Sequence, residues 1–147
     1  MKTAATLRLV GHFLVAVLAC TVLGTVVQTQ FNLAELQRLG VDIPVDVRLK
    51  TIAADLLGFS PNFGPIVLVG FAIAFAAAGA LCRRTPAWCG GWFVVAGAAA
   101  IFTAMALMSM IFEITPVAAV RGPVGLTALC ACGAVGGHLF RRLRMRR

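Results

Sequence analysis

Two histidine–cysteine pairs form the most suggestive chemical pattern in the sequence. His12 precedes Cys20 by eight residues, and His138 follows Cys130 by eight residues. On two helices of opposite direction, each pair spans about 12 Å, so the histidines share one depth. Contact between those helices would allow a haem or metal redox centre. The alternative is a local hydrogen bond for each histidine. Because a histidine pair alone lacks the further ligands of a metal site, we expect no metal or other cofactor.

A carboxylate inside a membrane helix can couple the movement of protons. Glu113 is the only acidic residue outside the segment 32–59. Counting along a helix that starts near Pro86 predicts that Glu113 reaches the level of the lipid headgroups, with Arg121 across a short turn. This spacing favours a local ion pair between Glu113 and Arg121 that closes the turn. A transport role for Glu113 is the alternative.

The cysteines and the remaining motifs do not indicate an enzyme. The five cysteines contain no C-x-x-C motif, and Cys82 and Cys89 flank a loop expected in the reducing cytoplasm. The sequence therefore predicts free thiols at these two positions. It also lacks a Gly-rich phosphate-binding loop, an H-E-x-x-H motif and an outward-facing Ser/His/Asp set. We expect a protein without catalytic activity.

The elements that carry these residues are membrane-spanning helices. Hydrophobic residues make up 61% of the 147 residues, and the mean hydropathy of +0.96 far exceeds that of soluble proteins. Runs of about 20 apolar residues match the hydrocarbon thickness of a bilayer. The sequence predicts an all-α integral membrane protein, a four-transmembrane-helix bundle in which residues 1–147 form one domain. The first span continues past a lipoprotein-like string, so we expect it to be retained. The expected spans are 9–28, 61–81, 87–111 and 122–140.

The basic residues indicate the orientation. Nine of the 13 lie at the ends of spans on one side of the membrane, and all five acidic residues lie on the other. Lysine and arginine are retained on the cytoplasmic side, so we expect an N-in/C-in protein of the bacterial inner membrane. The net charge of +8 includes a basic tail, 141–147, directly after the last span. Without interleaved aromatic residues, this tail predicts contact with lipid headgroups and no nucleic-acid partner.

The segment 32–59 is expected in the periplasm. Asn32, with Glu35 three residues later, resembles a capping box, and Gly40 is a typical helix stop. These signals predict a first short helix over 33–39, separate from the first span.

A second short helix is expected over 47–57, between Asp46 as N-cap and Gly58 as stop. It is amphipathic, and a helix of this length needs a surface on which to dock. We expect its apolar side to pack on the bundle, the lipid leaflet or a partner, with the opposite side exposed. The apolar side consists of Leu49, Ile52, Ala53 and Leu56, and the opposite side of Arg48, Thr51 and Asp55.

Small residues recur at intervals of four in every span and predict close helix packing, either within one bundle or between subunits. The members of these series are Ala16, Cys20 and Gly24; Ala72, Ala76 and Ala80; Ala96, Ala100 and Ala104; and Ala128, Cys132 and Gly136, with Gly133 and Gly137.

The string QTQFNL closes the first span, and DLLGFSP enters the second. With these strings, the layout resembles small uncharacterised four-span inner-membrane proteins of Gram-negative bacteria. The resemblance implies a compartment and no particular activity.

These observations lead to a functional hypothesis. We expect a non-enzymatic accessory or assembly subunit that lies in the lipid bilayer and docks a partner through the periplasmic segment. The partner is another inner-membrane or periplasmic protein, or a second copy in a homo-oligomer. The alternatives are an oligomeric transporter of small solutes or ions that uses Glu113, and a redox carrier that uses His12 and His138. The residues expected to bind the partner are Glu35, Arg38, Asp42, Arg48 and Asp55.

Overall fold

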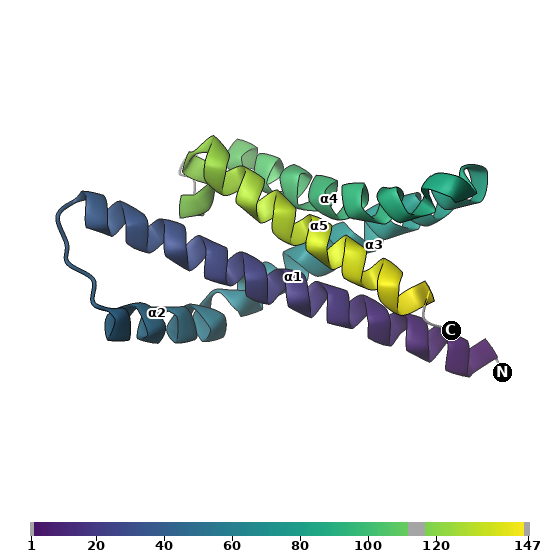
Figure 1. Cartoon of the computed structure of the whole chain (residues 1–147), viewed down its shortest axis with the longest axis horizontal. Coiled ribbons are helices and arrows are strands. Elements are labelled where there is room, and N and C mark those ends of the chain that lie inside the picture. The colour runs from purple at the N-terminus through teal and green to yellow at the C-terminus, as the bar shows by residue number, and fades with distance from the viewer. Residues whose placement is uncertain (1, 112–116, 146–147) are drawn as a thin grey trace.

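The computed structural model describes residues 2–111 and 117–145, and it is helical throughout apart from short connections (Figure 1). Four helices in the described residues are long and apolar enough to cross a membrane: α1, α3, α4 and α5. The prediction of an all-α, multi-pass membrane protein is confirmed at this level. The elements in order are α1 (Lys2–Arg38), α2 (Val45–Gly58), α3 (Ser60–Arg84), the 3₁₀ helix η1 (Pro86–Trp88), α4 (Cys89–Ile111), the 3₁₀ helix η2 (Ala118–Arg121) and α5 (Pro123–Met145).

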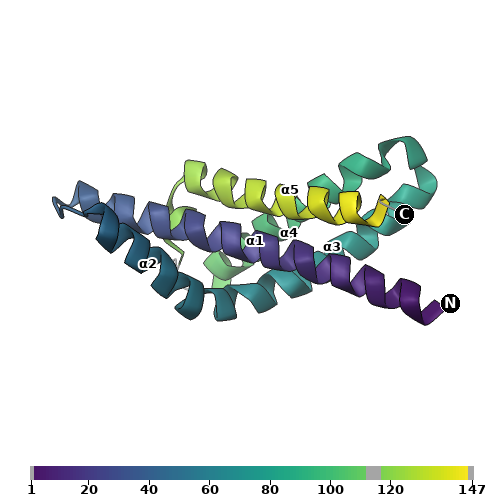
Figure 2. The same cartoon turned by 60° about the horizontal axis from the view of Figure 1, so that its bottom comes forward.

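The bundle has two chemically different ends. The beginning of α1, the turn between α3 and α4 and the end of α5 lie together at one end, whereas the loop between α1 and α2 lies at the other (Figures 1 and 2). We call the first the arginine end because it carries Arg8, Arg83, Arg84, Arg141, Arg142 and Arg144. Residues 141–145 of the predicted basic tail are part of α5, which continues to Met145.

Aromatic side chains fill the core between α1, α3, α4 and α5. The ring of Phe75 lies 4.9 Å from that of Phe140, 5.7 Å from that of Phe93 and 4.6 Å from that of Phe71, measured between centroids. All four rings are buried. Because lipid tails are as apolar as these side chains, close packing and not exclusion from water holds such a core together.

Glycines allow the backbones of α4 and α5 to approach each other closely. A Cβ atom on Gly97 would collide with the carbonyl oxygen of Gly133, and one on Gly137 would collide with that of Phe93. This part of the small-residue pattern therefore packs inside the bundle. In α3, by contrast, Ala72 and Ala76 are exposed on the surface.

The predicted break between the first span and a short helix over 33–39 is wrong, because α1 continues without interruption to Arg38. Asn32 therefore does not cap a helix. No Gly or Pro occurs between residues 25 and 39, so nothing prevents the backbone from continuing its hydrogen bonds. Gly40 ends the helix as predicted: its φ is +85°, and its N–H donates to the carbonyl of Gln37 at 3.0 Å.

Helix α2 begins at Val45, so Asp46 lies in its first turn and is not the predicted N-cap, and α2 leads almost directly into α3. It ends at Gly58 as predicted, and only Phe59, with a helical backbone, separates the two helices. Ser60, the first residue of α3, makes no capping hydrogen bond with its side chain. Its hydroxyl lies 3.0 Å from that of Thr25 on α1. Because Phe59 is helical, Ser60 has no extended backbone from which to cap.

The turn between α3 and α4 joins Cys82 and Cys89 in a disulfide bond. This pairing differs from the free thiols expected from the sequence. The two residues bracket a tight turn: they are seven positions apart in sequence, and their Cα atoms lie 4.5 Å apart. The indole N–H of Trp92 also donates to the hydroxyl of Thr85 at 2.7 Å across this turn. The antiparallel helices thus bring together two cysteines that no short motif connects.

Candidate functional site

The most distinctive feature outside the four spans is the outer hairpin, which we define as residues 29–58. In it, α2 turns back along the last part of α1, at the end of the molecule opposite the arginine end (Figures 1 and 2). This hairpin contains all the described acidic residues, which are Glu35, Asp42, Asp46 and Asp55.

A carboxylate of α2 is bonded to a buried hydroxyl of α1. Thr29 is fully buried, and its Oγ1 atom donates to Oδ2 of Asp55 at 2.7 Å. The same hydroxyl lies 2.9 Å from the carbonyl oxygen of Thr25. One hydroxyl has one proton, so these two acceptors compete for it. Asp55 is therefore held against the bundle.

Hydroxyl groups continue from this bond into the bundle along one side of α1. Thr25 is buried and donates to the carbonyl of Thr21 at 2.8 Å, which leaves its oxygen to accept from Ser60. One turn further in, the buried Oγ1 of Thr21 has no hydrogen-bond partner among the described residues. We call Thr21, Thr25, Thr29, Ser60 and Asp55 the polar seam. Its sequence signal is the recurrence of threonine every four residues in the first span.

Arg48 connects α2 to α1 through two glutamines. Its guanidinium donates to Oε1 of Gln30 at 2.7 Å and to Oε1 of Gln37 at 3.2 Å. Gln30 and Gln37 lie seven residues apart, on the same side of α1. Arg48, in the first half of α2, and Asp55, in its second half, thus hold α2 against α1.

These contacts correct the expected orientation of α2. Arg48, Thr51 and Asp55 were expected to face outward, but they are partly buried on the side toward α1, together with Ile52 and Leu56. The physical reason is that the neighbouring part of α1 is polar: Thr29, Gln30 and Gln37 offer hydrogen-bond partners. A charged group gains more from such partners than an apolar side chain would.

The rotation of α2 exposes an apolar stripe. Val45, Leu49 and Leu57 are 72%, 61% and 81% exposed, and Ala53 is also exposed. Because these four residues recur every four positions, they lie on one side of α2, and we call them the outer stripe. Only Leu49 and Ala53 belong to the apolar side identified from the sequence.

Three of the five residues expected to bind a partner remain on the surface. Glu35 and Arg38 form an exposed ion pair at 2.9 Å, and Asp42 is exposed in the loop. Arg48 and Asp55 bind α1 instead. An exposed pair such as Glu35–Arg38 contributes little to stability, so its charges remain available for contacts outside the chain.

The 3₁₀ helix η2, which precedes α5, is attached to α1. The backbone N–H of Ala119, in η2, donates to Oε1 of Gln28 at 2.9 Å. Glu113, the proposed partner of Arg121, lies outside the described residues. Arg121 ends η2 and is exposed. The predicted ion pair between them stays a prediction.

The structure separates the two histidines of the redox hypothesis. Helices α1 and α5 do pack together, since a Cβ atom on Gly136 would lie 3.2 Å from the carbonyl oxygen of Ala16. His138, however, is two residues from Gly136, a rotation of roughly 200° around α5, and it is exposed. It lies on the side of α5 away from α1, whereas His12 is partly buried. Residues 2–111 and 117–145 contain no cluster of three or more metal-binding side chains.

Comparisons with protein-family models, with curated proteins and with solved structures found no match for this chain.

Proposed function

We propose that this protein is a non-enzymatic accessory or assembly subunit of the bacterial inner membrane, which docks a partner protein through the outer hairpin. One observation carries the proposal: the outer stripe is apolar and exposed, while the polar side of the same helix is occupied by α1. We assign the arginine end to the cytoplasm, with both termini inside and the hairpin in the periplasm, because basic residues are retained on the cytoplasmic side.

The length of α1 supports a protein partner over a lipid one. At 37 residues, α1 is about 55 Å long, whereas the hydrocarbon core is about 30 Å thick and takes about 20 residues. Counted from Arg8, that length ends near Gln28. Most of the outer hairpin then lies beyond the hydrocarbon, where exposed Leu49 meets water or headgroups. Covering a leucine side chain releases about 1.5–3 kcal/mol, so a matching apolar surface gains affinity there.

The exposed charges are suited to the rim of such an interface. Glu35, Arg38 and Asp42 lie near the tip of the hairpin and remain exposed. Charged groups at a rim influence the rate and selectivity of association more than its affinity. The apolar outer stripe then supplies most of the binding energy, as the buried centre of an interface does.

The experiment is affinity purification of the chain at its native level in a mild detergent, with mass spectrometry of the proteins that accompany it. Leu49→Asp introduces a charge into the outer stripe, and we expect it to reduce the recovery of the partner at least tenfold. Lys50→Asp is the matched control, because it places the same side chain at an exposed position of α2 outside the stripe.

Either of two results would contradict the proposal. Equal recovery of the partner with Leu49→Asp and with Lys50→Asp would show that the stripe is not the docking surface. A wild-type sample that contains neither a second copy of the chain nor another protein in stoichiometric amount would leave the stripe without an occupant. Circular dichroism of each variant confirms that the helices are retained.

A further inference from the structure

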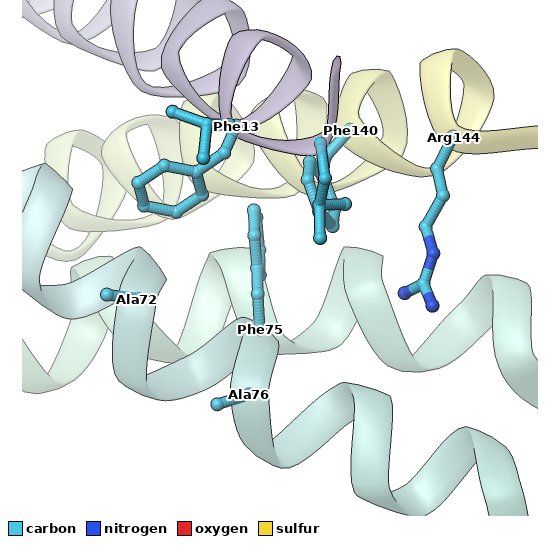
Figure 3. Close-up of a pocket in the computed structure, with 8 residues that line it drawn as sticks. Phe13, Ala72, Phe75, Ala76, Phe140 and Arg144 are labelled. Carbon is cyan, nitrogen blue, oxygen red and sulfur yellow. The ribbon is translucent and has the colours of Figure 1, made fainter. Parts of the chain in front are cut away.

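A groove between α1, α3 and α5 opens on the surface of the bundle in the half nearer the arginine end (Figure 3). Its volume is about 340 Å³, within the range of small-ligand sites. The residues that matter below are Phe13 from α1; Ala72, Phe75 and Ala76 from α3; and Phe140 and Arg144 from α5.

The walls of the groove are apolar and firmly packed. The ring of Phe13 lies 6.2 Å from that of Phe75 and 6.3 Å from that of Phe140, both at nearly right angles. Phe75 and Phe140 are buried at the base, whereas Ala72 and Ala76 are exposed and keep one wall low. Larger side chains at the two alanines would close the groove.

The groove faces hydrocarbon when the helices span a bilayer. All three helices that form it are among those long and apolar enough to cross the membrane. An apolar cavity open to lipid is filled by acyl chains, since voids lose the dispersion contacts of their lining. The shape of the groove therefore suits a hydrocarbon chain.

Arg144 gives this otherwise apolar groove a cation. Its guanidinium lies on the groove side of α5 (Figure 3). It is 5.8 Å from the ring centroid of Phe93 on α4. The described acidic residues all belong to the outer hairpin at the opposite end, so none of them neutralises it. A guanidinium binds a phosphate group through two parallel hydrogen bonds.

The spacing of the two features matches one kind of molecule. Arg144 follows Phe140 by one helical turn, about 6 Å toward the arginine end. A lipid whose acyl chain lies against Phe13, Phe75 and Phe140 would bring its phosphate to this level. We infer that the groove binds an acidic phospholipid from the leaflet at the arginine end, with its phosphate on Arg144.

The test is native mass spectrometry of the purified, delipidated protein, titrated with phosphatidylglycerol or with phosphatidylcholine. We expect one phosphatidylglycerol to bind tightly, with an affinity about tenfold lower in Arg144→Gln, the loss typical of a hydrogen bond to a charged group. Arg142→Gln removes the same charge from an exposed residue on the other side of α5 and should bind like the wild type.

A second pair of variants tests the apolar part of the site. Ala76→Trp fills the groove and should weaken the binding of both lipids, whereas Ala77→Trp, at the neighbouring exposed position outside the groove, should not. This pair leaves every charge in place, so it reports on the acyl chain alone.

Three results would overturn the inference. Equal weakening by Arg144→Gln and Arg142→Gln would indicate diffuse attraction to the basic tail. Because both lipids carry a phosphate and only phosphatidylglycerol has a net negative headgroup, equal affinity for the two lipids would show that the site does not select an acidic phospholipid. Retention of a single-chain fatty acid in place of the phospholipid would show another occupant. None of these results depends on the docking of a partner at the outer hairpin.

Discussion

Thr29 on α1 and Asp55 on α2 share a hydrogen bond of 2.7 Å at the point where the outer hairpin meets the four-helix bundle. Thr29 is fully buried there, so its hydroxyl has no access to solvent as an alternative partner. The bond connects the hairpin to the hydroxyl groups of the polar seam. It makes the carboxylate of Asp55 a structural group and removes it from the outward surface.

Loss of this carboxylate should destabilise the protein. We expect Asp55→Ala to lower the free energy of unfolding by about 1–3 kcal/mol, because it removes a hydrogen bond between a charged group and a buried hydroxyl. Asp55→Asn retains an acceptor oxygen and should lose less. Thermal unfolding in detergent measures both. Asp46→Ala, at an exposed position of the same helix, is the control, and an equal loss from it would contradict the assignment.

Arg48 should hold α2 against α1. Arg48→Ala removes the bonds to Gln30 and Gln37. We expect the loop 39–44 to be cut by protease several-fold faster, because cleavage follows the local opening of the hairpin. Arg48→Lys should behave almost like Arg48→Ala, since an ammonium group lacks the fork that contacts two acceptors at once. Arg38→Ala removes an exposed arginine nearby, and unchanged cleavage is expected from it.

The contact between α4 and α5 should not tolerate side chains at its glycines. In Gly133→Ala the new methyl group would meet the backbone of Gly97, which cannot move as a side chain can. We expect a loss of about 1–3 kcal/mol or more, measured as a lower unfolding temperature in detergent. Gly79→Ala in α3 meets no atom within 4 Å and should leave stability unchanged or slightly increased. A similar loss in both variants would mean that the close approach is absent.

The redox state of Cys82 and Cys89 should report the orientation of the chain. If the arginine end is cytoplasmic, both thiols remain reduced in growing cells and form their bond only after treatment with an oxidant such as diamide. Acid quenching followed by a maleimide that adds mass shows the difference on a gel, with Cys82→Ser as the control that cannot form the bond. A disulfide in freshly quenched cells would place this turn on the oxidising side and reverse the proposed orientation.

The spans were predictable because the bilayer imposes its thickness on any helix that crosses it. The apolar runs agree with α3, α4 and the start of α5 to within three residues, whereas α1 extends well beyond its apolar run at both ends and α5 continues five residues further. Gly40 was predictable for a similar reason: a φ of +85° strongly favours glycine. These signals are local or set by the solvent, and they need no knowledge of the neighbouring helices.

The predictions that failed concern residues whose arrangement depends on contacts along the chain or with a neighbouring helix. The cap signal at Asn32 contributes only about 1 kcal/mol, less than the backbone bonds that an uninterrupted α1 retains. The sequence predicts that the apolar side of α2 packs against a neighbouring surface. The adjacent part of α1 is polar, however, and its residues Gln30 and Gln37 accept hydrogen bonds from Arg48. The pair of Cys82 and Cys89 and the groove at Arg144 depend on helix packing, which one sequence does not reveal.

Because α1 is one uninterrupted helix, it connects the outer hairpin directly to the groove. Its outer part is fixed to α2 through Gln30 and Gln37, its middle rests on α5 near Ala16, and its inner part supplies Leu9 and Val10 to the groove wall. A helix without a joint transmits tilt along its whole length. A partner that tilts the outer part of α1 would therefore shift the inner part and change the width of the groove. By thermodynamic reciprocity, a lipid in the groove would change the affinity for that partner by the same factor.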